Sequence, residues 1–219
     1  MGTASGAGPR SIPGQARRED DRAERGPLPL EGIQMEEART VGSARPGPTG
    51  EATGEQVVLV DAADRAIGTA EKLSVHREAK LHRAVSVFVF NAEGALLLQR
   101  RAATKYHSAG LWSNTCCSHP RPGEDPLEAA RRRLEEEMGL ACDLYPVFRF
   151  VYRAELGGGL VEHEYDHVFA GWSDQDPRPD PREVAEWRWA AVDELCAEIA
   201  ERPGDYTPWF RLALAILLR

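Results

Sequence analysis

The apolar residues of the chain divide it into two parts. Residues 1–54 are mostly Gly, Pro, Arg, Glu and small polar residues, and apolar residues show no sustained period there. Such a segment buries too little apolar surface to offset the entropy lost on ordering, so we expect residues 1–54 to be a disordered tail. From residue 55 the apolar residues recur in short runs, which predict one folded domain at 55–219.

These apolar runs predict a β-sheet. Stretches rich in Val, Leu and Phe at 57–60, 84–90 and 95–99 are typical of strands, and the turn at 91–94 joins the last two into a hairpin. Longer runs at 147–154 and 160–172 predict two strands joined by the three glycines at 157–159. The run 187–190 predicts a short edge strand. The segment 101–122 is irregular and polar, as is typical of loops that carry functional sites.

Helical signals lie between and after these strands. Asp125 has the features of an N-cap, with Pro126 at the first helical position and Glu128 three residues after the cap. We expect this helix to reach Met138 and to end at Gly139. Further helices are predicted near 193–201 and from 207 onward, the last with an apolar run at 212–218 that suits packing on a sheet. The pattern predicts an α/β (α+β) fold, a mixed β-sheet sandwich with helices on both faces.

Charge and composition exclude several classes of function. The formal net charge of −8 argues against a broad nucleic-acid surface. No apolar run of about 18 residues occurs, so we expect no membrane span, and no N-terminal apolar segment indicates secretion. The four cysteines have no regular spacing and two are adjacent, which favours a reduced, cytoplasmic protein over a disulfide scaffold.

Candidate chemistry gathers around the helix at 126–138. The segment from Trp112 to Pro120 brings a thiol and an imidazole to its start, and arginines and glutamates follow within the helix itself. Arg133 and Glu137 are four residues apart and share a helix face, although such pairs are most often solvated surface salt bridges. Glu162 and Glu164 are two residues apart on a predicted strand, so both project to one face. These are the parts of a metal site that handles a diphosphate and moves a proton.

The helix resembles the Nudix box, the diphosphate-binding loop–helix–loop of a large superfamily. The resemblance rests on Glu124 and on the run Arg-Arg-Leu-Glu-Glu-Glu-Met-Gly-Leu at 132–140. Two departures are informative. Ser118 stands where the box usually opens with glycine, and Arg133 stands where hydrolytic members have a glutamate that helps a metal-bound water to attack phosphorus. A cation at this position makes hydrolysis harder to support and offers a charge partner to a diphosphate.

The segment Asn-Thr-Cys-Cys-Ser-His-Pro at 114–120 is similar to the Asn-x-x-Cys-x-His-Pro signature of the type I isopentenyl-diphosphate isomerase family, itself a Nudix relative. The resemblance covers about residues 55–212. The other matching positions are Gly68, Thr69, 72–76, His82, Arg101, Lys105, 112–114, Tyr152, Glu162, Glu164 and 207–209.

This resemblance implies two metal functions and a set of phosphate-binding cations. The metal ligands that it implies are His76, His82, His119, Glu162 and Glu164, a mixed shell that suits Mn²⁺, Mg²⁺ or Zn²⁺. Glu137 would bind a Mg²⁺ that bridges to the substrate diphosphate. The implied phosphate-binding residues are Lys72, Arg101, Lys105 and Arg133. We expect the remaining histidines, His107, His163 and His167, to be surface or core residues.

The implied reaction moves a double bond by adding a proton at one carbon and removing a proton from another. Cys117 and Glu164 are the expected acid/base pair on opposite faces of the alkene, with Tyr152 supporting the proton near Glu164. Trp209 would place its indole face against the positive charge, which contributes about 1–2 kcal/mol. The partner is a small prenyl diphosphate, and we expect a monomer or a weak homodimer.

Two alternatives remain from the sequence. One is a Nudix hydrolase that acts on nucleoside or prenyl diphosphates, against which Arg133 and the 117–119 segment argue. The other is a non-catalytic diphosphate-binding module, which would have lost the thiol or the glutamate pair. Neither is lost, because Cys117, Glu162 and Glu164 are all present.

Overall fold

A computed structural model describes residues 54–219 and the backbone of Ile33–Met35. Its strands join into one ten-stranded sheet, whose main path runs β1-β8-β9-β4-β2-β3. The strands are β1 (Ile33–Met35), β2 (Gln56–Val60), β3 (Ala66–Glu71), β4 (His82–Phe90), β5 (Leu96–Arg101), β6 (Trp112–Ser113), β7 (Cys116–Ser118), β8 (Leu144–Gly157), β9 (Leu160–Trp172) and β10 (Val184–Ala190). The helices are α1 (Lys72–Arg77), α2 (Pro126–Met138), α3 (Val192–Glu201), the 3-10 turn η1 (Pro203–Asp205) and α4 (Pro208–Leu217).

Strand β4 is the centre of the sheet. One of its edges pairs with β9 in parallel along the whole strand, from His82 opposite Glu164 to Phe90 opposite Trp172. The other edge is shared, because β2 pairs with its start, β7 with its middle and β5 with its end. The sheet therefore branches at β4, and β10 forms an edge beside β5.

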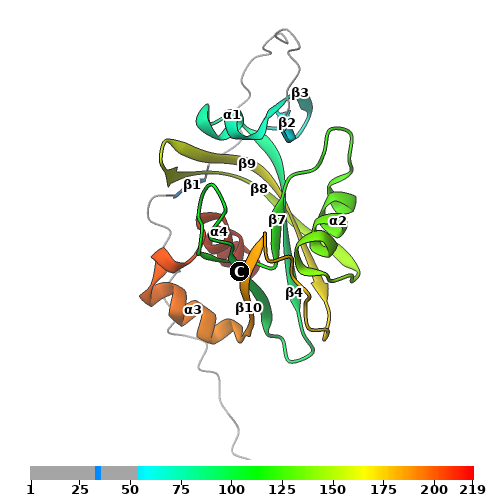
Figure 1. The fold of residues 1–219 in the computed structure, drawn as a ribbon, viewed down its shortest axis with the longest axis vertical. Helices are drawn as coiled ribbons and strands as arrows, with labels where there is room; N and C mark the ends of the chain where they lie inside the picture. Colours follow the sequence, from blue (N-terminus) through cyan, green and yellow to red (C-terminus); the bar gives the residue numbers. More distant parts are fainter. Residues whose placement is uncertain (1–32, 36–53) are drawn as a thin grey trace, which may run out of the picture.

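Helices cover both faces of this sheet, as the sequence predicts (Figure 1). Side chains of β4 and β5 alternate between two hydrophobic cores. Phe88 and Leu96 belong to the core that includes α3 and α4, whereas Val87 and Leu97 belong to the core that includes α2. Strands buried on both faces read as nearly continuous apolar runs, which explains the patterns at 84–90 and 95–99.

Helix α2 begins and ends as its sequence predicts. The Asp125 side chain accepts hydrogen bonds from the backbone N–H groups of Leu127 and Glu128, with Pro126 at the first helical position. Gly139 ends the helix with φ 61°, in the left-handed region that favours glycine. A Cβ at Gly139 would lie 2.5 Å from the Arg178 carbonyl oxygen, so the close approach of this loop also requires glycine.

Several short elements escape sequence prediction. Strand β3 has no buried–exposed alternation, helix α1 has six residues, and β6 and β7 have two and three residues. Elements this short carry too few positions to show a period. Strand β1 lies within the predicted tail and pairs antiparallel with the edge of β8. The other residues of the predicted tail, up to 53, lie outside the described residues.

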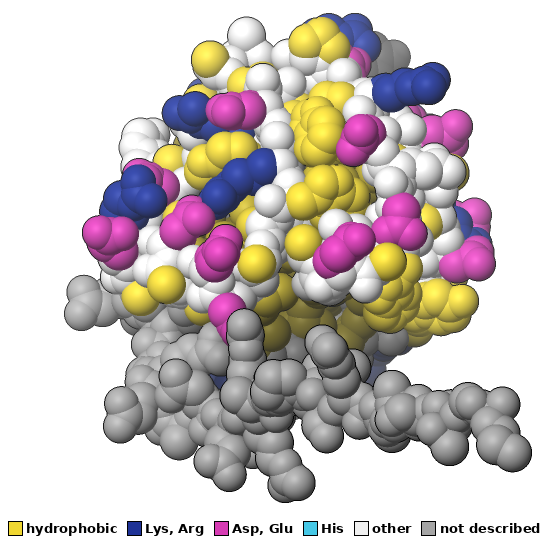
Figure 2. All heavy atoms as spheres, turned by 90° about the horizontal axis from the view of Figure 1, so that it is seen from below, with side chains coloured by type: hydrophobic (Ala, Val, Ile, Leu, Met, Phe, Trp, Pro, Cys, Tyr) yellow, Lys and Arg dark blue, Asp and Glu magenta, His cyan; other side chains and the backbone are white. Residues whose placement is uncertain are grey.

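Basic, acidic and apolar side chains are mixed on one face of the molecule (Figure 2). On the face shown in Figure 2, basic side chains are scattered among acidic and apolar ones and form no continuous patch. Among the described residues, no helix has both the length and the apolar composition that crossing a bilayer would require.

Candidate active site

A cavity of about 420 Å³ collects most of the residues that the sequence singles out. Its wall includes side chains from strands β4, β7 and β9, from helices α1, α2 and α4, and from the loop at 102–111. The predicted residues on this wall are Lys72, Arg101, Lys105, Cys117, His119, Arg133, Glu137, Glu162, Glu164 and Trp209. The other three predicted residues lie directly behind the wall: His76 and His82 contact the glutamates, and Tyr152 donates a hydrogen bond to Glu164.

Three histidines and two glutamates converge at one end of the cavity. One nitrogen or oxygen atom from each of His76, His82, His119, Glu162 and Glu164 lies within 4.8 Å of all the others, and all five side chains are buried. The strand pairing explains part of this convergence, since His82 and Glu164 are direct neighbours in the parallel β4–β9 ladder. His76 arrives from α1, and His119 follows β7.

The donor set fits a divalent cation. His76 and His82 each place Nδ1 against a backbone carbonyl oxygen, 2.6 Å from that of Lys72 and 2.9 Å from that of Lys80. A proton on each Nδ1 leaves the Nε2 lone pair directed at the cluster, the orientation that a metal-binding imidazole needs. His76 Nε2 lies 3.0 Å from a Glu162 oxygen, and His82 Nε2 lies 3.2 Å from His119 Nε2. Several lone pairs therefore face one another, and a cation between them would satisfy them all.

The charges of the cluster follow from its burial. Burial acts to lower the pKa of His76, but the hydrogen bond and the charge of Glu162 raise it to about 8. Burial lowers the pKa of His119 to about 3, despite its contact with Glu164. Burial alone would raise the pKa of Glu164, yet hydrogen bonds with His119 and His82 hold it well below its usual range. Glu164 is thus an ionised carboxylate, while burial and the Glu164 charge raise the pKa of Glu162.

Cys117 lies on the cavity wall with its sulfur held by two neighbours. The thiol donates to the Asn114 side-chain oxygen at 2.9 Å, and the Trp209 indole N–H donates to the sulfur at 3.0 Å. The Asn114 amide nitrogen donates to two backbone carbonyl groups, which fixes its oxygen toward the thiol. Burial, with a smaller contribution from the charge of Asp166, raises the pKa of Cys117 to about 12, so its sulfur carries a proton at neutral pH.

The adjacent cysteines face opposite sides of the sheet. Cys116 is fully buried in the core that includes α2, whereas Cys117 is half-buried against the core that includes α4. Alternation along strand β7 explains the difference. Only Cys117 of the two lines the cavity.

Tyr152 and Trp209 complete the apolar end of the site. The Tyr152 hydroxyl is fully buried and donates to Glu164 Oε2 at 2.5 Å. The Trp209 indole nitrogen is shared between Cys117 and Ser113, at 3.0 Å from each. Thr207, just before α4, also contacts the Ser113 hydroxyl, so the start of α4 is held against β6.

The predicted phosphate-binding cations also line the cavity, and most of them have carboxylate partners. Lys72 pairs with Glu55 at 3.1 Å, and Lys105 pairs with Glu183. Arg101 differs, because its Nε is buried without a partner and its guanidinium lies 5.3 Å from the Trp209 ring centre. Its Nη2 donates to the His107 carbonyl oxygen at 3.3 Å, which leaves the positive charge without a carboxylate partner among the ion pairs of the described residues. A buried guanidinium of this kind on a cavity wall fits an anion.

Helix α2 contributes the remaining cation and a separate carboxylate. Arg133 bonds Glu136 at 2.6 Å and Glu137 at 2.5 Å, and Glu137 also accepts from Gln99 at 3.2 Å. Glu137 is not part of the histidine–glutamate cluster. The i, i+4 pair of Arg133 and Glu137 therefore lines the cavity instead of a solvated helix face.

The structure adds two residues that the sequence does not single out. His107 lies on the cavity wall, with Nε2 3.5 Å from Glu162 and its ring stacked on His76, so it differs from the surface or core histidine that we expect. Asp166 is fully buried, accepts from Ser86 at 2.7 Å, and has its pKa raised well above the usual range by burial and by Glu164. The alternation of Glu162 and Glu164 along β9 extends to residue 166, a signal that could have identified Asp166.

Comparison with known proteins gives consistent matches. The NUDIX domain model matches residues 80–210. Isopentenyl-diphosphate Delta-isomerase 1 of Aromatoleum aromaticum is 54% identical over 160 residues, which cover 73% of this chain and 90% of that protein. Isopentenyl-diphosphate Delta-isomerase of Pectobacterium atrosepticum is 50% identical over 160 residues, 73% of this chain and 89% of that protein.

Solved structures of lower sequence identity share the fold. A protein from Deinococcus radiodurans aligns with a TM-score of 0.57 at 23% identity, over 67% of this chain and 90% of that one. The MutT protein from Methanosarcina mazei aligns with a TM-score of 0.51 at 21% identity, over 63% of this chain and 91% of that one. The chain therefore belongs to the Nudix superfamily and, within it, to the isopentenyl-diphosphate Delta-isomerase family.

Proposed function

We propose that the chain converts isopentenyl diphosphate to its allylic isomer, dimethylallyl diphosphate, in isoprenoid biosynthesis. One observation carries the proposal: a thiol and an ionised, buried carboxylate, Cys117 and Glu164, line the same cavity from different strands, and Trp209 lies beside the thiol. The same cavity presents the cations that a diphosphate requires. This combination supplies acid, base and anchor for an alkene that carries a diphosphate.

The chemistry explains why these groups are needed. A proton adds to the terminal methylene carbon, the tertiary carbon becomes positive, and a proton leaves the methylene carbon next to the diphosphate-bearing carbon. One proton is gained and one is lost, so the reaction is an isomerisation without net proton change. Of Cys117 and the Tyr152–Glu164 pair, one adds a proton to the alkene and the other removes a proton from it. The Trp209 ring stabilises the positive carbon. The sequence does not fix which group delivers the first proton.

Two divalent cations belong to this proposal. His76, His82, His119, Glu162 and Glu164 would hold one, which would fix the Glu164 carboxylate and lower its basicity. Glu137 would bind a Mg²⁺ that accompanies the substrate, offsetting the negative charge that a diphosphate brings. Arg101, Lys105, Lys72 and Arg133 would bind the phosphate oxygens and so orient the alkene between Cys117 and Glu164.

The position of Arg133 favours isomerisation over hydrolysis. Hydrolysis requires an activated water at phosphorus, for which hydrolytic Nudix proteins use a carboxylate where this chain has Arg133. Its guanidinium is held by Glu136 and Glu137 and cannot serve as a base.

A product assay tests the proposal directly. The purified protein is incubated with isopentenyl diphosphate and Mg²⁺, with and without EDTA, and organic and inorganic phosphate products are separated. We expect dimethylallyl diphosphate in the absence of EDTA and almost none in its presence. Release of inorganic phosphate or pyrophosphate without the allylic product would refute the proposal in favour of hydrolysis. A cytoplasmic location and a monomeric or weakly dimeric state remain predictions, to be tested by fractionation and by light scattering.

A further inference from the structure

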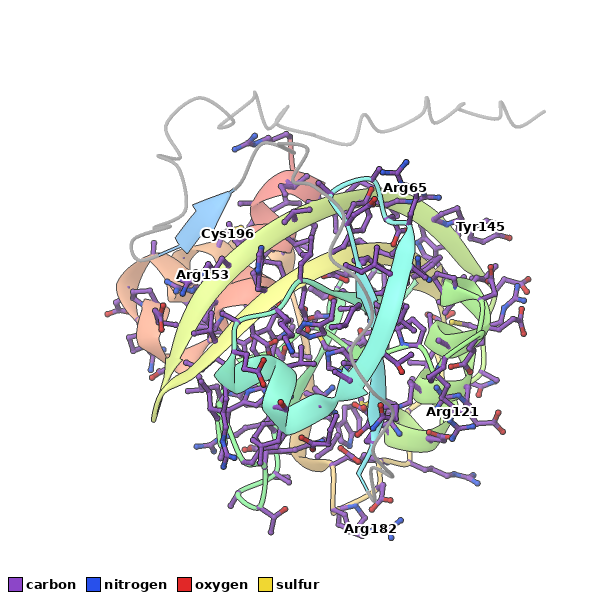
Figure 3. The ribbon with its side chains drawn as sticks, turned by 90° about the horizontal axis from the view of Figure 1, so that it is seen from above. Arg65, Arg121, Tyr145, Arg153, Arg182 and Cys196 are labelled. Carbon is purple, nitrogen blue, oxygen red and sulfur yellow. The ribbon has the colours of Figure 1, made fainter. Side chains whose placement is uncertain are left out.

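Glu183 lies on the cavity wall beside two of the predicted phosphate-binding cations, although nothing in the sequence pattern marks it. The residue lies immediately before β10 and lines the cavity together with Lys105 and Arg133. Its carboxylate pairs with Lys105, and its other oxygen lies 3.5 Å from the Arg133 Nη2 atom. The neighbouring Arg182 points outward (Figure 3) and pairs with Asp180. Of these two neighbours, Glu183 lines the cavity and Arg182 does not.

The backbone at the same position fixes the loop that carries Lys105. The Ala102 backbone N–H donates to the Glu183 carbonyl oxygen at 3.0 Å, and Val184 pairs with Arg101 in the β5–β10 ladder. Residue 183 thus touches the 102–111 loop through both its backbone and its side chain. It also reaches Arg133 of α2, so one acidic residue contacts two of the predicted phosphate-binding cations.

The contacts of Arg133 suggest which bond is exchanged when an anion binds. Two of its nitrogen atoms are held by Glu136 and Glu137 of the same helix at 2.6 and 2.5 Å. The 3.5 Å separation from Glu183 exceeds the 2.7–2.9 Å typical of a charge-assisted hydrogen bond, so this ion pair is loose. Arg101, more than nine-tenths buried on the same wall with an unpartnered Nε, indicates independently that an anion belongs there.

We propose that Glu183 is an internal counter-anion of the diphosphate site, holding Lys105 and Arg133 until substrate phosphate oxygens replace its carboxylate. This inference deepens the proposed function and rests on it for the identity of the anion. A diphosphate must displace the Glu183 carboxylate from these cations, and this displacement weakens the net binding free energy. Removing the carboxylate should therefore tighten diphosphate binding, the opposite of what loss of a binding residue does.

The test measures binding of inorganic pyrophosphate to the purified protein by calorimetry, at fixed ionic strength and without added Mg²⁺. Glu183→Gln keeps the size and the backbone contacts of the residue and removes only its charge. Glu183 forms partly exposed ion pairs with two cations, so we expect Glu183→Gln to bind pyrophosphate about two- to tenfold more tightly than the unmodified protein. Glu186→Gln is the matched control, because Glu186 pairs with Arg100 at 3.1 Å outside the cavity and its loss should leave binding unchanged.

Weaker or unchanged pyrophosphate binding by a folded Glu183→Gln variant would overturn the inference. Glu183 would then either keep its contacts with Lys105 and Arg133 when the anion binds or have no effect on binding. Thermal unfolding verifies that the variant is folded. If it is not, Glu183→Asp provides the second variant: the shorter side chain retracts from Lys105, and a smaller tightening is expected, whereas weaker or unchanged binding overturns the inference. Allylic product is assayed separately with unmodified protein, so a protein that binds pyrophosphate as expected but forms no allylic product would refute the proposed function alone.

Discussion

Replacing each of the adjacent cysteines separately tests the assignment of the catalytic thiol. Cys117→Ala removes the only thiol of the 116–117 pair that lines the cavity. A positioned acid or base contributes about 10²–10⁴-fold to rate, so we expect turnover to fall by at least that factor, which corresponds to about 2.7–5.5 kcal/mol. The measurement is the initial rate of dimethylallyl diphosphate formation, together with pyrophosphate binding, which should persist.

The hydrogen bonds around the sulfur indicate a small cost in stability for Cys117→Ala. Trp209 Nε1 keeps its bond to the Ser113 hydroxyl at 3.0 Å, and the Asn114 oxygen keeps the same hydroxyl at 3.2 Å. No buried donor is therefore left without a partner, and we expect a loss of about 1 kcal/mol or less in unfolding free energy. The lost activity then reflects lost chemistry and not a damaged fold.

Cys116→Ala is the matched control, for which we expect a loss of stability but little loss of activity. Cys116 is fully buried in the α2 core, so removal of its sulfur leaves a small cavity and should cost about 1–2 kcal/mol of stability. Its neighbour Glu137 remains held by Arg133 and Gln99, so most activity should survive. Loss of turnover in Cys116→Ala together with full activity in Cys117→Ala would refute the assignment.

Three further outcomes test other parts of the structure. His82→Ala removes a central atom of the histidine–glutamate cluster, so elemental analysis should show loss of the metal that copurifies with the unmodified protein; equal metal content in both would contradict the cluster. Tyr152→Phe removes the hydroxyl that donates to Glu164 and should lower kcat by about tenfold or more while KM changes little, because the ring stays packed; an unchanged kcat would exclude a role for the hydroxyl. Hydrogen bonds from Arg188 and then Tyr206 lower the pKa of Glu198 from 4.5 to about 2, so the stabilisation is present above pH 4.5 and is lost as pH falls toward 2. Urea unfolding should show Glu198→Gln to be less stable by about 1–2 kcal/mol at pH 7, with the difference shrinking below pH 4.5, and a difference constant with pH would contradict this.

Sequence periodicity predicted the regular part of the fold because those elements are long and buried. The strands β4, β5, β8 and β9 and the helix α2 all show their period over six or more residues. The sequence predicts both ends of α2, because the Asp125 side chain can cap the first N–H groups and Gly139 can adopt the left-handed conformation. Short elements such as β7 and α1 depend on tertiary contacts, which leave no period in the sequence.

Some residues of the candidate site follow from local sequence patterns, and others depend on tertiary contacts. Alternation alone placed Glu162 and Glu164 on one face, and it also explains why Cys116 and Cys117 separate. No local rule could bring His76 to the same point, because its position depends on how α1 packs against β9. That residue was identified only through the family resemblance. His107 and Glu183 lie in irregular segments before or between strands, where neither periodicity nor motif marks them.

The register of the central strands has a consequence for how the protein assembles. His82 and Glu164 are partners in a parallel ladder between segments far apart in the chain, and the intervening residues include α2 and four other strands. Parallel pairing between distant segments closes a large loop and is slow to form. The ligand cluster therefore exists only after this long-range pairing of β4 with β9 has formed. A divalent ion can secure the finished molecule, but it cannot nucleate folding as it does in a zinc finger.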